Sequence, residues 1–253
     1  MAKRKAALLL LAVAATAHAD WAIRSANSEP GRAGIVHRHV VLENAGGNES
    51  AIVDLAIFST KSCTLRVIDN QVGETLSNAM ARAKCVAAAN GGYFSPDFTP
   101  IGLLISDGKT VAPWQRARLI TGVLSASARG VQVLRVREFS SREKLNAAVQ
   151  CGPFLVDHYE RVRGLNDSQP ARRTFAATGT NDLALLGVCS EISLAELATI
   201  LATTRLADDL KIQRALNLDG GSSSAFWFAR ENGTTFSIPE QKPVRDFVGV
   251  VPR

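Results

Sequence analysis

Alternation of apolar and polar residues recurs along the chain, and a period of two predicts β-strands. Residues 35–42 and 50–58 alternate in this way on either side of the polar, glycine-containing segment 44–48, so they predict a hairpin. Apolar segments predict further strands at 65–69, 85–90, 120–124, 131–136, 149–157 and 244–251, and hairpins within 101–111 and 174–188. We therefore expect many short strands.

Two segments have the apolar spacing of an amphipathic helix instead. Residues 74–83 place Leu76 and Met80 on one face, which predicts a short helix. Ser193-Leu194-Ala195-Glu196 is a capping box, because the serine hydroxyl and the glutamate carboxylate can each bind a free backbone N–H at a helix start. We expect that helix to run to about Leu210, and we expect a helix or a turn at 141–148.

The first nineteen residues have the three parts of a secretory signal peptide. Lys3, Arg4 and Lys5 precede an apolar run at 6–15, and Ala17-His18-Ala19 has the form of a cleavage site. The run is too short to anchor in a bilayer, and no later segment approaches eighteen unbroken apolar residues. We predict a signal peptide at 1–19, one domain at 20–253, and export to the periplasm or the medium, with no membrane span.

Charge argues against a nucleic-acid partner. The 253-residue chain has a formal net charge of +6, but removal of the signal peptide leaves 26 basic and 23 acidic residues, a net charge of +3. The basic residues are spread along the chain rather than clustered on one helix, which favours a solvated surface.

Cysteine and histidine usage gives little support for a metal site. The four cysteines, Cys63, Cys85, Cys151 and Cys189, contain no CxxC, and in an exported protein they could form two disulfides in any of three pairings. His37 and His39 lie two residues apart, so they share one face of a predicted strand, which we interpret as an exposed face rather than a metal site. We predict no cofactor, and leave open a divalent cation beside Asp219.

The segment 215–224 is the strongest candidate for a functional site. Leu216 and Leu218 can point into the core while Asn217 and Asp219 share the opposite face, so a strand ends on a carboxylate. Gly220 and Gly221 then allow a ligand or another backbone to come close, and Ser222 begins a run of three hydroxyls.

A second strand ends in the same form. Residues 85–90 run into Asn90-Gly91-Gly92, which suggests that two neighbouring strands bring Asn90 and Asp219 to one rim. Gly152-Pro153 interrupts an apolar run and predicts a kink where the backbone itself is presented. Arg172 and Arg173 are adjacent at a strand start, and either guanidinium could hold a phosphate or a carboxylate by two hydrogen bonds.

Two kinds of chemistry could use this rim. A serine hydrolase would need a base near the serines at 222–224, where GxSxG is absent because Ser224 replaces the last glycine, and His158 is the available partner. A carboxylate mechanism at an anomeric carbon fits the residues better, with Asp219 as nucleophile or base.

Six motifs in order resemble the phosphodiester glycosidase family. They are Asn90-Gly91-Gly92-Tyr93-Phe94, Gly102 before Asp107-Gly108, Cys151-Gly152-Pro153-Phe154-Leu155-Val156, Arg172-Arg173-Thr174, Ser193 to Ala198, and Leu216 to Ser223. The resemblance is strongest over 86–251. It implies an α/β or α+β fold, a single domain with a central mixed β-sheet flanked by helices, and hydrolysis of a sugar-1-phosphodiester at its glycosidic bond.

The resemblance also implies roles for individual residues. Asp219, Arg173 and Glu191 are the catalytic candidates. The substrate-binding candidates are Asn90, Gly91, Gly92, Gly152, Arg172, Gly220, Gly221, Ser222 and Lys242. Lys242 stands where the family often has an arginine, so it could supply the charge without the two-point geometry.

The partner implied in this way is a saccharide or sugar phosphate, as in a bacterial envelope or extracellular polysaccharide. A non-catalytic protein that binds saccharides or sugar phosphates in envelope polysaccharide metabolism is the alternative. It would bind sugar phosphates and leave them intact.

Overall fold

The computed structural model describes residues 21–253, and the predicted signal peptide lies outside the described residues. The strands are β1 (Trp21–Pro30), β2 (Val36–Asn44), β3 (Ser50–Ser59), β4 (Cys63–Asp69), β5 (Ala87–Asn90), β6 (Leu104–Ser106), β7 (Lys109–Ala112), β8 (Gly122–Ser127), β9 (Gly130–Arg135), β10 (Leu145–Cys151), β11 (Phe154–Asp157), β12 (Glu160–Arg161), β13 (Ala171–Gly179), β14 (Leu183–Ile192), β15 (Ile212–Asn217), β16 (Phe226–Ala229), β17 (Thr235–Ile238) and β18 (Asp246–Pro252). The α-helices are α1 (Leu76–Ala83) and α2 (Leu194–Thr203), and η1 (Arg32–Gly34) and η2 (Gly221–Ser223) are short 3-10 turns.

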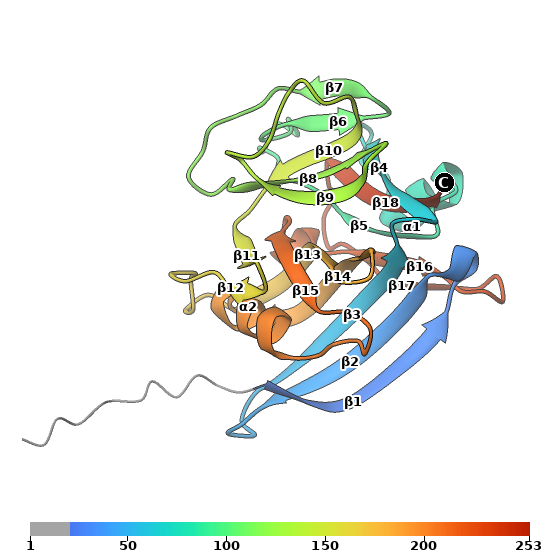
Figure 1. Cartoon of the computed structure of the whole chain (residues 1–253). Helices are drawn as coiled ribbons and strands as arrows, with labels where there is room; N and C mark the ends of the chain where they lie inside the picture. Colours follow the sequence, from blue (N-terminus) through green and yellow to red (C-terminus); the bar gives the residue numbers. More distant parts are fainter. Residues whose placement is uncertain (1–20) are drawn as a thin grey trace, which may run out of the picture.

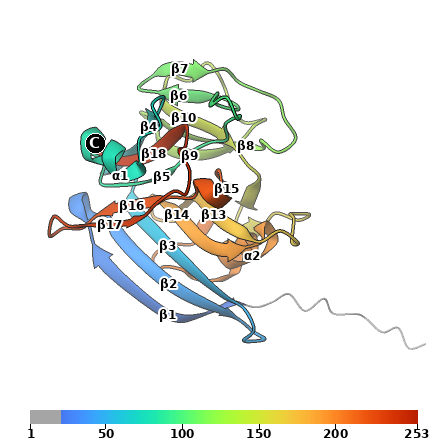
Figure 2. The same ribbon diagram turned by 180° about the vertical axis from the view of Figure 1, so that it is seen from behind.

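These strands form three sheets. One has eight strands in the order β1-β2-β3-β14-β13-β15-β11-β12, and two have five strands, in the orders β7-β6-β10-β8-β9 and β17-β16-β5-β18-β4. Figures 1 and 2 show the eight-stranded sheet below the sheet of β6 to β10, with the sheet of β5 and β18 to one side between them.

The expectation of a central mixed sheet flanked by helices is corrected by this topology. Every pairing between the described strands is antiparallel, and the chain is 51% strand and only 10% helix. Each α-helix connects two strands of one sheet, α1 between β4 and β5 and α2 between β14 and β15, but an antiparallel strand lies between the two strands in each case, so no parallel pairing forms. The α and β elements are both present, but sheets dominate.

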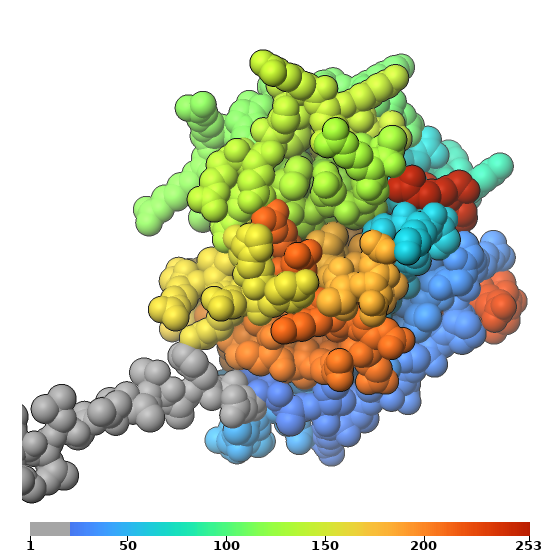
Figure 3. Space-filling model, viewed as in Figure 1, coloured from blue at the N-terminus to red at the C-terminus, as the bar shows by residue number. Residues whose placement is uncertain are grey.

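A single apolar cluster joins the three sheets. Ala176 and Leu186 from the eight-stranded sheet, Val149 from β10, and Val67 and Val248 from the remaining sheet all belong to it. Strands β13 and β14 are apolar on both faces, since their other faces contact α2. Figure 3 shows one face of the molecule, where the green residues of β6 to β10 lie above the orange residues of the eight-stranded sheet and the blue residues of that sheet lie below.

The helices cover the outer faces of two sheets. Leu197 and Ile200 of α2 pack against the eight-stranded sheet, and Leu76 and Met80 of α1 pack against the sheet of β5. The capping box is confirmed, because Glu196 N–H donates to Ser193 Oγ over 3.1 Å and Ser193 N–H donates to the Glu196 carboxylate over 2.8 Å. Neither described helix has the length and apolar character needed to cross a membrane.

Most local predictions from the sequence are confirmed, with two exceptions. The helix that begins after Ser193 ends at Thr203 rather than near Leu210. Residues 145–148, the second half of the segment where we expected a helix or a turn, belong to strand β10 between β6 and β8. The alanines of β10 fit a strand buried on both faces, so tertiary packing overrides their helix propensity.

The four cysteines are free thiols and all are buried, so the structure does not support the expected disulfides. Burial raises the pKa of Cys85 to about 11 and that of Cys189 to about 12, which keeps both thiols protonated at neutral pH.

The interpretation of His37 and His39 as an exposed strand face is wrong for His37. Both side chains contact Asp54 and so share a face, but His37 is only 4% exposed. Its ring lies between the carboxylates of Glu29 at 2.7 Å and Asp54 at 2.8 Å, and the Phe236 ring covers it at 4.5 Å between centroids. Aromatic residues from β16 and β17 therefore bury the strand face that the local sequence leaves polar.

Candidate active site

Asp219 lies where the eight-stranded sheet meets the sheet of β5. Strand β15 ends at Asn217, and the next two residues are bonded to different parts of the chain. Leu218 N–H donates to Thr174 O at 2.8 Å, and Asp219 N–H donates to Gly91 O at 3.0 Å. Gly221 then has φ of +61°, a left-handed conformation that glycine adopts without strain, and it starts η2. The Asp219 side chain is partly exposed at this junction.

Asn90 is the residue that joins the two sheets. Its Nδ2 donates to Asp219 O over 2.7 Å, and its Oδ1 accepts from Thr174 Oγ1 over 2.7 Å and from Ala225 N–H over 3.0 Å. The predicted meeting of Asn90 and Asp219 is therefore present, although β5 and β15 are not neighbours but belong to different sheets. Asn90 is fully buried, so the structure places it behind Asp219 as a residue that positions the backbone.

Asp246, at the start of β18, is a site residue that sequence reasoning missed. Gly92 N–H donates to its Oδ1 over 2.9 Å, and Gly91 N–H donates to its carbonyl oxygen over 3.0 Å. A Cβ atom on Gly91 would lie 1.9 Å from Asp246 Oδ1, so the Gly-Gly pair is what makes room for this carboxyl group. Its Oδ2 is buried and has no hydrogen-bond partner among the described residues.

The two acids have raised pKa values for the same main reason. Burial raises the pKa of Asp246 to about 6, and the charge of Asp219 adds to the rise, while the Gly92 N–H and Arg245 oppose it. Burial also raises the pKa of Asp219, which the Ser223 hydroxyl, the Gly220 N–H and the charge of Lys242 counteract. Two acids that interact while partly or fully buried are typical of a functional site.

Tyr93, Gly152 and Asn217 form a hydrogen-bonded wall beside these acids. Tyr93 Oη donates to Gly152 O over 2.5 Å, and Asn217 Nδ2 donates to the same carbonyl over 3.0 Å. Burial raises the pKa of Tyr93 well above its ordinary value, with a contribution from the charge of Asp219, so the phenol stays a donor. The kink predicted at Gly152-Pro153 presents its carbonyl to these side chains.

The two adjacent arginines are held by backbone carbonyls. Arg172 Nη2 donates to Ser224 O over 2.5 Å and to Pro239 O over 3.2 Å. Arg173 Nε donates to Ile192 O over 2.9 Å, and burial lowers its pKa while the nearby Tyr93 opposes this. Within residues 21–253 neither guanidinium is paired with a carboxylate, so no acid neutralises either charge.

Lys242 is the third cation near Asp219. Gln241 N–H donates to Ser222 O over 2.8 Å, which fixes the segment before Lys242 against the turn that follows Asp219. The Lys242 ammonium lies 5.2 Å from the centre of the Phe94 ring, and its charge lowers the pKa of Asp219. The structure thus brings together Asp219, Gly91, Gly92, Gly220, Ser222 and Lys242, with Asn90, Gly152, Arg172 and Arg173 around them.

Glu191 and the histidines lie elsewhere. Glu191 is exposed and borders a separate cavity of about 300 Å³ with Trp21, Asp167 and Glu196. His158 lies 3.3 Å from Arg214 Nη2, and His37 and His39 are bonded to Asp54, so each described histidine has partners away from the serines at 222–224. In the described part of the chain, no three His, Cys, Asp or Glu side chains form a group that could hold a metal ion.

An acid pair beside cations that lack acidic partners is typical of an enzyme that acts on an anionic substrate. The family model of the phosphodiester glycosidases matches residues 83–251. Because this match covers more than half of the sequence, the chain belongs to the phosphodiester glycosidase family, as its motifs predicted.

Solved structures share the fold at low sequence identity. The catalytic domain of zebrafish N-acetylglucosamine-1-phosphodiester alpha-N-acetylglucosaminidase, auto-inhibited by its pro-peptide, has a TM-score of 0.61 and 16% identity, over 93% of this chain and 83% of that one. A hypothetical protein from Synechocystis has a TM-score of 0.60 and 16% identity, over 87% of this chain. A Burkholderia pseudomallei protein thought to be exported has a TM-score of 0.56 and 14% identity, over 80% of this chain and 74% of that one.

Two further results limit what these comparisons show. The aligned part spans 62% of the length of the Synechocystis protein. None of the curated proteins is similar enough in sequence to match this chain.

Proposed function

We propose that this protein hydrolyses the glycosidic bond of a sugar-1-phosphodiester and releases a free sugar and a phosphomonoester. The observation that carries the proposal is the partly exposed Asp219 carboxylate, held at the junction of two sheets, with the charge of Lys242 acting on it and with Arg172 bonded to the turn that follows it. Membership of the phosphodiester glycosidase family supports this assignment.

The proposed reaction breaks the bond between the anomeric carbon and the phosphate oxygen. The bonding electrons leave with the phosphate, and water supplies the hydroxyl group of the free sugar. A phosphomonoester has a last pKa of about 6, so the leaving group needs little protonation at neutral pH. One strong acid catalyst is therefore unnecessary, in contrast to an ordinary glycoside.

Each charged group has a proposed part in this step. Arg173 and Arg172 bind the non-bridging phosphate oxygens, since a guanidinium can hold two oxygens at once. Asp219, ionised, attacks the anomeric carbon or activates the water that does so. Lys242 favours the ionised state of Asp219 and adds positive charge near the phosphate.

We also propose that the protein is exported and acts on saccharide phosphates of the envelope or the extracellular space. The signal-peptide pattern at 1–19 supports this, as does the fold shared with a Burkholderia pseudomallei protein thought to be exported.

The test is turnover of a panel of sugar-1-phosphodiesters, beginning with N-acetylglucosamine-1-phospho-methyl and nitrophenyl compounds, by the mature chain and by Asp219→Asn. We expect Asp219→Asn to lower kcat by about a thousandfold, because a positioned carboxylate contributes on the order of 10²–10⁴ in rate. The amide can still accept the Gly220 N–H, so circular dichroism should not change, and because burial raises the pKa of Asp219 the unfolding midpoint should not fall.

The exposed Asp208→Asn is the matched control and should keep full turnover. Equal turnover by wild type and Asp219→Asn would remove the carboxylate assignment. If both bind members of the panel and neither turns one over, the chain is a non-catalytic saccharide-binding protein and the proposed reaction is wrong.

A further inference from the structure

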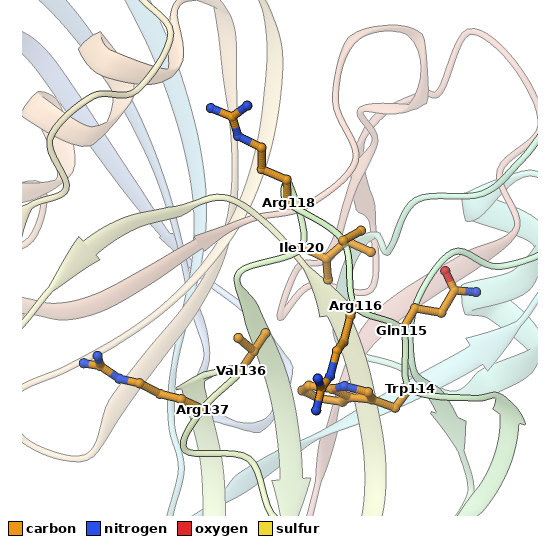
Figure 4. A pocket seen from close by; sticks show the side chains of 8 residues that line it. Trp114, Gln115, Arg116, Arg118, Ile120, Val136 and Arg137 are labelled. Atoms are coloured by element: carbon orange, nitrogen blue, oxygen red, sulfur yellow. The ribbon is translucent and has the colours of Figure 1, made fainter.

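A pocket of about 540 Å³ lies on the loop between β7 and β8, outside the Asp219 site. The residues that define its chemistry are Trp114, Gln115, Arg116, Arg118, Ile120 and Arg137. In Figure 4 the Arg116 side chain extends toward the Trp114 ring, whereas Arg118 and Arg137, which are also exposed, extend from the pocket in two other directions. Its volume is in the range of small-ligand sites, about 300–1,000 Å³.

The charge of this pocket is only partly compensated by the protein. Arg116, Arg118 and Arg137 form no ion pair or side-chain hydrogen bond with a carboxylate in residues 21–253, although the charge of Arg137 acts on its neighbour Glu138 and lowers the pKa of that carboxyl. Other arginines of this chain differ, since Arg135 pairs with Asp157 at 2.9 Å and Arg214 pairs with Glu138 at 2.6 Å. Three unpaired guanidinium groups around one cavity are suited to a ligand with more than one negative charge.

The pocket also has an apolar wall on a fixed loop. Trp114 stacks on Phe139 with ring centres 4.9 Å apart and an interplanar angle of 13°, and its ring is partly exposed. Gln150, which is 1% exposed, accepts the Gln115 N–H at 3.1 Å and donates to Gln115 O at 2.7 Å. The aromatic wall is therefore held in place before any ligand binds, which reduces the entropy lost on binding.

The loop adjoins the wall of the candidate active site. A Cβ atom on Gly152 would lie 2.3 Å from Leu119 O and 2.7 Å from Thr121 N, so this loop packs directly on Gly152. The Gly152 carbonyl is the group that binds Tyr93 and Asn217. The loop that carries the pocket therefore packs on a residue of the wall beside Asp219.

We propose that this pocket binds an anionic saccharide, with acidic groups on Arg116, Arg118 and Arg137 and a sugar ring against Trp114. The inference rests on the proposed function in one respect, namely that the saccharide is the part of the substrate beyond the cleaved bond. The amphipathic indole suits a ring with one apolar face, and the arginines select chains that carry carboxylate or phosphate groups.

The experiment is calorimetric titration of the mature chain with hexagalacturonate, with uncharged maltohexaose of equal length as the comparison. The variant is Arg116→Ala/Arg118→Ala. The matched control is Arg142→Ala/Arg205→Ala, which removes the same charge from two exposed positions outside the pocket. We expect hexagalacturonate to bind the wild type and the control within about twofold of each other, and the pocket variant about tenfold or more weakly, as the loss of two charge-assisted contacts implies.

Three results would overturn the proposal. The first is no binding of hexagalacturonate, or binding no tighter than that of maltohexaose. The second is equal weakening by the two double variants, which would mean general charge attraction. The third is tighter binding of the oligonucleotide dT6 with the same dependence on Arg116 and Arg118, which would make the pocket a nucleic-acid site. Because binding is measured without turnover, none of these results depends on whether Asp219 is catalytic.

Discussion

Two buried polar networks in this chain differ in whether their charged groups are paired with groups of opposite charge. In the first, the His37 ring lies between the carboxylates of Glu29 and Asp54, and Arg230 Nε lies 2.6 Å from the other oxygen of Glu29. In the second, Asp219 and Asp246 interact with each other, and Asp246 Oδ2 has no hydrogen-bond partner among the described residues.

The pKa shifts show which charge state each network favours. Burial lowers the pKa of His37, but the hydrogen bonds and charges of Asp54 and Glu29 outweigh it and raise the pKa above its ordinary value. The folded state thus favours the charged form of His37 and the neutral form of Asp246. The first network stabilises the fold, whereas the second lowers stability at neutral pH, as is typical of residues retained for function.

The largest effect is expected when the paired network is broken. Asp54→Asn removes a charge that both His37 and His39 contact, and breaking a buried pair costs about 3–5 kcal/mol of unfolding free energy. The full decrease in unfolding free energy is expected at pH 6. A histidine whose pKa is raised in the folded state contributes its full stabilisation below its ordinary pKa of about 6.5. It should shrink as the pH rises through the folded pKa of His37.

Chemical denaturation of Asp54→Asn and wild type at pH 6 and pH 9 measures this change. The exposed Asp208→Asn serves as the control. An unchanged stability at pH 6 would show that the network does not stabilise the fold.

The unpaired network should respond in the opposite direction. The rise in the pKa of Asp246 from 3.8 to about 6 corresponds to about 3 kcal/mol of destabilisation at pH 8, which is lost below about pH 3, where the group is protonated in both the folded and the unfolded state. Asp246→Asn keeps an acceptor for the Gly92 N–H and removes the charge. It should therefore be more stable than wild type at pH 8, by up to about 3 kcal/mol, and equally stable at about pH 3.

The same variant should lose activity. Negative charge near the anomeric carbon stabilises the positive charge that develops there in the transition state, and we expect Asp246 to contribute through its interaction with Asp219. Denaturation curves at both pH values and turnover of the panel measure the two effects together. A variant that is less stable than wild type at pH 8 would show that the Asp246 carboxylate supports the fold.

The smallest effect concerns Lys242. Its charge lowers the pKa of Asp219, so Lys242→Met should move the acidic limb of the kcat/KM profile to higher pH. Lys242 is exposed, so screening limits the shift to about half a pH unit or less. Lys211→Met is the matched control, because the Lys211 ammonium lies 4.9 Å from the Tyr159 ring, and it should leave the profile unchanged. A shift to lower pH would contradict the assigned electrostatics.

Local signals predicted the elements whose structure is determined locally. The hairpin of β2 and β3, the capping box of α2 and the strand that ends before Asp219 all follow from residues close together in the chain. Strand β1 was not predicted, because most of its side chains are exposed at a sheet edge and carry no strong apolar pattern. The division into three sheets depends on pairings that no local pattern encodes, such as β3 with β14.

The same limit applies to the site. Asp219 and Asn90 were found because each follows an apolar strand and precedes two glycines. Asp246 was missed because its partner, Gly92, is 154 residues away, although a lone acid at the start of an apolar strand was a usable signal. The burial of His37 was missed because the phenylalanines that cover it lie nearly two hundred residues later.

Hydrolysis of N-acetylglucosamine-1-phospho-methyl in H₂¹⁸O by the mature chain tests the central claim most directly. Cleavage at the anomeric carbon leaves the phosphate oxygens untouched, so mass spectrometry should find no ¹⁸O in the methyl phosphate. One ¹⁸O atom in the methyl phosphate would mean attack at phosphorus, and the site around Asp219 would then be that of a phosphodiesterase rather than a glycosidase.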